Sequence, residues 1–247
     1  MTNNYGFGGD EVHEESSWRY LIGIFLATLI LSAILLFYYV GPTVDDINGT
    51  VPSPTVSEDI VDINLGEHQF KVPANYTVFP RERRGGEVSS LSLYALWPAM
   101  TGYGPAWKLE FIDNDPDTRR IDIVVSLRST SFTELDRIET LYLPHTIDKR
   151  GARTPYSLNR HTFRQERDNV PTNGYADTTL FIGQATDNQT MALFCYNEVP
   201  TIPSPECWRE YELNKDISVI YRYKRPYLAE WREIDERVRQ FILDLTK

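Results

Sequence analysis

The longest apolar run of the chain covers residues 20–40 and contains no charged residue. A helix of this length, at about 1.5 Å rise per residue, spans the roughly 30 Å hydrocarbon core of a bilayer. The backbone must be helical there, because no water is present to satisfy its peptide groups. Tyr20 at one end and Tyr38 and Tyr39 at the other fit the aromatic belts of a membrane span. The pattern predicts one transmembrane helix.

A cleaved signal sequence is the alternative interpretation of this run. The apolar part of a signal sequence is about 7–15 residues long and ends at a small-residue cleavage site. This run is longer and ends in FYYVGP at residues 37–42, so we expect an uncleaved anchor. The flanking bases are Arg19 before the run and Lys71 as the first base after it. By the positive-inside rule, residues 1–19 form a short cytoplasmic tail and the rest of the chain lies outside.

The segment 41–59 combines three prolines with Ser, Thr and Asp. Polar proline-rich segments are extended at about 3 Å per residue, so we expect a spacer between the bilayer and a folded domain. The alternative is a loop that packs on that domain.

Alternating apolar and polar positions predict strands along residues 60–247. Two runs, 60–65 and 68–72, flank Gly66-Glu67 and fit a hairpin with a two-residue turn. Further strands are expected at residues 91–97, 121–127, 178–185, 190–196, 208–213 and 217–223. The fold class is therefore α+β: a transmembrane helix, then an extracytoplasmic domain of antiparallel hairpins with two packed helices. Two similar halves, 60–143 and 177–247, are one interpretation of the order of elements.

The two helices of the domain are predicted at residues 131–143 and 226–245. The first begins with a sequence typical of a capping box, Ser131 to Glu134, and Pro144 ends it. The second has an apolar stripe at spacings of three and four residues. The stripe can pack on a sheet or pair with a second copy, and Gly23 with Ala27 permits pairing of the transmembrane helices. A homodimer through either helix is thus an open alternative.

Composition and charge narrow the class of partner. Aromatic residues make up 13% of the 247 residues, as in a folded chain. The net charge is −10, and much of it comes from the acids of segments 1–19 and 41–63. No basic stripe is present, so we expect no nucleic-acid partner.

The two cysteines, Cys195 and Cys207, enclose a short proline-rich loop. An even pair of this kind can close a disulfide in an oxidising compartment. Two buried free thiols are the alternative.

A search for chemical motifs gives no catalytic, cofactor or metal site. The chain contains no nucleophile elbow, P-loop or zinc-protease motif, and its four histidines are far apart. The acidic stretch 113–117 has calcium-loop spacing, but Thr118 stands where that loop needs glycine, so a turn is favoured. The Gly/Pro loop at 100–107 is a candidate contact loop through Tyr103 and Trp107, unless these rings pack on the core.

Several segments together resemble a group of small membrane-anchored proteins of alphaproteobacteria that has no known activity. The resemblance covers the N-terminal span, residues 64–75 with VPAN at their end, RRGG at 83–86, the strand 91–98 and the helix around Trp231. It implies a single-pass protein of the bacterial inner membrane with its C-terminal domain in the periplasm.

From these features we expect a domain for interaction or scaffolding, with an envelope protein as partner. One alternative is an envelope enzyme that acts on glycan or peptidoglycan, which requires a cleft with aromatic walls and two carboxylates of perturbed pKa. The other alternative is an accessory subunit of a larger membrane complex.

Overall fold

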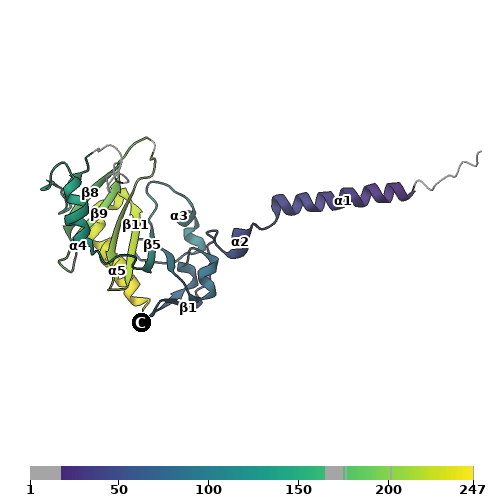
Figure 1. Cartoon of the computed structure of the whole chain (residues 1–247), viewed down its shortest axis with the longest axis horizontal. Helices are drawn as coiled ribbons and strands as arrows, with labels where there is room; N and C mark the ends of the chain where they lie inside the picture. Colours follow the sequence, from purple (N-terminus) through teal and green to yellow (C-terminus); the bar gives the residue numbers. More distant parts are fainter. Residues whose placement is uncertain (1–17, 165–174, 176, 201, 247) are drawn as a thin grey trace, which may run out of the picture. The chain divides into compact units, whose positions relative to one another are not determined.

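The computed structural model describes residues 18–164, 175, 177–200 and 202–246 (Figure 1). The expected tail lies mostly outside these residues. By its internal contacts the chain forms two compact units, Met1–Asn48 and Gly49–Lys247. The first unit contains helices α1 (Trp18–Val40) and α2 (Val44–Asn48).

Helix α1 confirms the predicted apolar helix. Its mean hydropathy is 2.6 and no side chain of it is buried, so it is long and apolar enough to cross a membrane. A signal sequence meets the same criteria of length and composition, so these alone do not separate it from an anchor. Within the helix, the Thr28 hydroxyl donates to the Ile24 carbonyl over 2.8 Å, which satisfies the hydroxyl without water.

The segment 41–59, expected as one spacer, is divided between the two units. Thr43 caps α2, and its N–H and hydroxyl both donate to the Asp46 carboxylate over 2.8 Å. From residue 49 onward the chain runs along the second unit, where the Ser53 N–H donates to the Val78 carbonyl over 3.1 Å. Residues 49–59 are therefore bonded to the domain, which corresponds to the loop alternative for that part.

The second unit contains a large antiparallel sheet and a small sheet. The large sheet has the strand order β4-β5-β11-β10-β9-β8-β7-β6. Its strands are β4 (Ser90–Leu96), β5 (Arg120–Leu127), β6 (Ala152–Arg153), β7 (Asn159–Thr162), β8 (Thr178–Gln184), β9 (Thr190–Tyr196), β10 (Glu206–Glu212) and β11 (Ile217–Lys224). The small sheet has the order β2-β1-β3, with β1 (Ile60–Leu65), β2 (His68–Pro73) and β3 (Gly86–Glu87).

The predicted hairpins are confirmed as pairs β1–β2, β8–β9 and β10–β11. Gly66 has φ +58, a conformation that glycine adopts without cost in a two-residue turn. The α+β class is confirmed as well. Strand β3, the edge strand β6 and its neighbour β7 are not predicted by the sequence, because two to four residues are too few for an alternating pattern to be visible.

Helices cover both faces of the large sheet. In Figure 1, α4 (Glu134–Arg137) lies beside β8 and β9, while α5 (Trp231–Asp244) crosses the sheet near β5 and β11. The apolar face of α5 joins one face of the large sheet and the small sheet in the main core, with Trp231, Ile234, Val238 and Ile242 buried. A π-helical turn (Ile138–Tyr142) continues α4 and covers a second, aromatic core with Phe163 and Phe194.

The start of α4 differs from the predicted capping box. Thr133 is the N-cap, and its hydroxyl accepts from the Asp136 N–H while the Asp136 carboxylate accepts from the Thr133 N–H. The cap therefore lies two residues beyond Ser131. The physical reason is that Glu134, expected as the partner in the box, has its carboxylate buried in an ion pair.

Candidate partner-binding surface

The loop expected to make contacts, residues 100–107, leads directly into a short helix. A 3₁₀ turn (Pro105–Trp107) is followed by α3 (Lys108–Ile112). Pro105 sets the first φ angle of this turn, as proline does at a helix start. The loop is fixed to the segment around Asn75 of the same chain, because the Tyr103 N–H donates to the Asn75 carbonyl over 2.8 Å.

The two aromatic residues of the loop have different surroundings. Tyr103 is half-buried and lies edge-on to Phe111, with ring centroids 5.5 Å apart, in a small core with Tyr94 and Leu96. Trp107 is 46% exposed. Tyr103 therefore packs partly on this small core, whereas the Trp107 side chain is largely accessible to solvent.

Helix α3 adds two more exposed apolar side chains. Leu109 is 69% exposed and Ile112 is 51% exposed, whereas Phe111 on the opposite side of the helix is buried. We call Trp107, Leu109 and Ile112 the α3 patch. Large apolar side chains that are exposed along a short segment are candidates for protein–protein contact. The sequence singled out Trp107 only, because five helical residues are too few for a periodic pattern.

Charged groups surround the α3 patch. The Arg119 guanidinium lies 5.2 Å from the centre of the Trp107 ring. Its Nε and Nη2 both donate to the same carboxylate oxygen of Glu110, over 3.0 and 2.7 Å. Asp115 and Asp117 are exposed in the turn that follows α3. The rim of the patch is therefore acidic on the side of this turn.

A second group of polar residues lies inside the domain. Arg209 on β10 is 1% exposed and bonds to two carboxylates. Its Nη2 donates to Glu134 over 2.8 Å and its Nη1 donates to Asp235 over 2.5 Å. The Tyr221 hydroxyl donates to the same oxygen of Asp235 over 2.8 Å. Burial disfavours the charge of Arg209, but the two carboxylates outweigh it and raise the pKa of Arg209 well above its usual value.

Glu134 also completes the sheet at a gap. Strands β9 and β10 pair only from Cys207↔Cys195 to Arg209↔Leu193 among the described residues, and then part. The Ala192 N–H beyond that point donates to the Glu134 carboxylate over 2.8 Å. Since a buried N–H without a partner is costly, Glu134 takes the place of a neighbouring strand. The arrangement holds α4 to the sheet.

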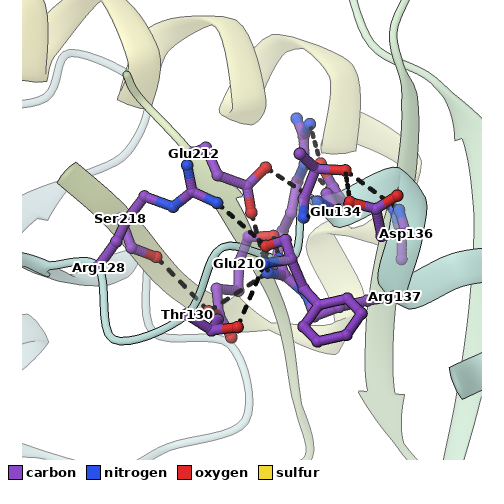
Figure 2. Close-up of polar contacts among 12 residues, drawn as sticks. Arg128, Thr130, Glu134, Asp136, Arg137, Glu210, Glu212 and Ser218 are labelled. Atoms are coloured by element: carbon purple, nitrogen blue, oxygen red, sulfur yellow. Dashed lines mark hydrogen bonds and ion pairs between the residues drawn. The ribbon is translucent and has the colours of Figure 1, made fainter. Parts of the chain in front are cut away.

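Next to this gap, a further ion-pair group reaches the surface (Figure 2). Figure 2 shows Arg137 among Glu210, Glu212 and Glu134, close to Ser218 and Arg128. The Arg137 Nη1 lies 2.9 Å from Glu212 and 3.8 Å from Glu210, and its Nη2 donates to the Glu210 carbonyl. The carboxylates of Glu210 and Glu212 are thus paired with Arg137 within the chain, so their role is structural and they do not form an empty ligand site.

The cysteine sulfurs are bonded to each other in the structure. Cys195 and Cys207 face each other across β9 and β10, with both side chains fully buried. In the described residues, no group of three or more His, Cys, Asp and Glu side chains is placed to hold a metal ion.

Comparisons with known proteins add one finding. No protein-family profile matches the chain, and no curated protein sequence matches it either. The structure is similar to that of Smlt3025, an immunity protein of the Stenotrophomonas maltophilia type IV secretion system, with a TM-score of 0.55. The match covers 76% of this chain and 94% of Smlt3025 at 17% sequence identity, so it shows a shared fold.

Proposed function

We propose that the chain is a membrane-anchored immunity-type protein whose extracytoplasmic domain binds and neutralises a toxic protein. The observation that carries the proposal is the fold shared with Smlt3025, which spans almost the whole of that chain. The domain follows an apolar N-terminal helix and contains a disulfide, a combination typical of a domain outside the cytoplasm. In this proposal α1 is an uncleaved anchor with its N-terminus in the cytoplasm, and the domain is in the periplasm.

The α3 patch supplies the contact with the partner. Its apolar side chains would be removed from water when a complementary apolar surface covers them. The acidic residues at its rim favour a partner with basic residues around that surface, because opposite charges steer association and disfavour other partners. This is the interaction function expected from the sequence, with a protein toxin as the partner.

The test is a co-culture of the encoding bacterium with a mutant that lacks this chain. We expect the mutant to lose viability when it touches parent cells, and the full-length chain to restore it. Equal survival of mutant and parent on a surface that forces contact would contradict the proposal. A form without residues 1–40 is the control for location, and we expect it not to protect.

The enzyme alternative gains no support from Glu82 and Glu134, two carboxylates whose pKa is raised by burial. Burial raises the pKa of Glu82 to about 6, yet this side chain is fully buried and both of its oxygens accept backbone N–H groups. Glu134 is bonded to Arg209. Both carboxylates act as structural acceptors.

A further inference from the structure

A cavity of about 600 Å³ lies at the β6 end of the large sheet, where the loop 154–158 and the first turn of α5 meet β7 and β8. It is lined by Arg153, Thr154, Ser157, Leu158, Asn159, Ile182, Gly183, Gln184, Thr190 and Arg232. Two of these ten residues are arginines and none is acidic. In a chain with a net charge of −10, this lining is distinctly positive.

The two arginines are available to a ligand. Arg153 and Arg232 are exposed, and neither forms an ion pair with another described residue. Some other arginines of the domain are paired within the chain, for example Arg119, Arg137 and Arg209. The guanidinium of Arg232 lies 5.1 Å from the centre of the Trp231 ring, a contact that limits its movement.

The walls of the cavity are held in place by bonds that do not involve the arginines. The Trp231 indole N–H donates to the Tyr156 carbonyl over 2.9 Å and ties α5 to the loop. The Thr154 N–H and hydroxyl both donate to the Leu158 carbonyl, over 2.8 and 2.9 Å, and close the loop on itself. A site whose walls are already fixed loses little freedom when it binds.

The remaining polar side chains of the lining are neutral. Those of Ser157, Asn159, Gln184 and Thr190 form no hydrogen bond with other described residues. Hydroxyl and amide groups can donate to an anion, and guanidinium groups bond carboxylate and phosphate oxygens in pairs. Gly183 packs closely against Leu158, since a Cβ there would stand 2.5 Å from Leu158 Cδ2.

We propose that this cavity binds an oxyanion, either a carboxylate or a phosphate group, between Arg153 and Arg232. The binding chemistry follows from the lining alone. Under the proposed function the anion is an acidic side chain of the toxin, and this identification rests on that function. The cavity then recognises an acidic segment of the partner, while the α3 patch contacts an apolar surface with a basic rim.

The experiment uses the full-length chain in micelles of a neutral detergent. Binding of a tetraglutamate peptide and of inorganic phosphate is measured by calorimetry at low and at physiological salt. Arg153→Gln and Arg232→Gln are each expected to weaken binding of the better probe at least tenfold. The matched control is Arg237→Gln, an exposed arginine on the same helix that does not line the cavity, and it should bind as the original chain does.

Each result has a definite meaning. Tighter binding of the peptide supports an acidic protein segment as the ligand of the cavity. Tighter binding of phosphate supports a small anion as that ligand. Unchanged affinity in both cavity variants, or an equal loss in Arg237→Gln, would overturn the site. The co-culture test is independent. Cavity variants that lose probe binding yet protect cells fully would leave the oxyanion site standing and refute its role in toxin binding, whereas equal survival of the mutant that lacks the chain would refute the proposed function.

Discussion

Two regions of this domain reverse the usual placement of side chains. Around Arg209 three charged groups are buried, and on α3 and the turn before it three large apolar side chains are exposed. Buried charges are tolerated when each has a partner, and Arg209 donates to both Glu134 and Asp235 inside the chain. In the α3 patch the Arg119 guanidinium lies over the Trp107 ring, and all three apolar side chains remain exposed. The comparison teaches that the first region is complete in the isolated protein, whereas under the proposed function the second is completed by the partner.

The largest effect is expected from breaking the buried charge group. Arg209→Met leaves two carboxylates buried without their cation, so we expect a loss of about 3–5 kcal/mol in the free energy of unfolding. Guanidinium denaturation followed by circular dichroism measures it. The matched control is Arg119→Met, which breaks a partly exposed pair and should cost about 0–1 kcal/mol. Equal losses in the two variants would contradict our interpretation of Arg209.

The disulfide next to this group should contribute somewhat less. It joins residues 12 apart in sequence, and the chain-entropy model gives about 3 kcal/mol for a loop of that size. We expect the double change Cys195→Ala and Cys207→Ala to lower stability by about this amount. A reductant should lower the stability of the original chain similarly and leave the double variant unaffected. An original chain that is insensitive to reductant after unfolding would argue against the crosslink.

A further test of the comparison uses the pH dependence of stability at Glu82, a buried carboxylate without an arginine partner. Burial raises the pKa of Glu82 from 4.5 to about 6. At a pH between these two values, the Glu82 carboxyl group is protonated in the folded chain and ionised in the unfolded chain. Stability from this group is therefore complete below pH 4.5 and is lost as pH rises through 6, by about 2 kcal/mol.

The measurement for Glu82 is the midpoint of chemical unfolding from pH 4 to 7. Glu82→Gln cannot titrate, so the difference between the original chain and this variant isolates the effect. We expect that difference to change by about 2 kcal/mol across the window. A constant difference would show that Glu82 has the same pKa in the folded and unfolded states.

The smallest effect on stability is expected on α3. Trp107→Ser changes an exposed side chain, so the free energy of unfolding should change by less than about 0.5 kcal/mol. Protection in the co-culture should nevertheless decrease. Phe111→Ala on the same helix is the opposite control, because removal of a buried ring costs about 3–5 kcal/mol. A large loss of stability in Trp107→Ser would mean that the patch belongs to the core.

The sequence predicted the elements whose signals are local. The hairpin around Gly66 and the strand of β5 follow from alternation and turn residues, and the apolar stripe of α5 follows from its spacing. The roles of charged residues could not be predicted in this way. Glu134 was assigned to a capping box because Arg209, its partner, lies 75 residues away in sequence. The sequence likewise offered no reason to expect that Arg153 and Arg232 line the same cavity, which forms only in the folded domain.

One bond between the ends of the domain has a consequence for how it is made. The Lys71 N–H on β2 donates to the Leu245 carbonyl over 2.7 Å, and the first hairpin shares its core with the last helix. A chain that is synthesised or translocated from its N-terminus presents β2 early and Leu245 near the end. The main core therefore cannot close until nearly all of the polypeptide has emerged, and a chain truncated before α5 would leave the apolar faces of both sheets open to water.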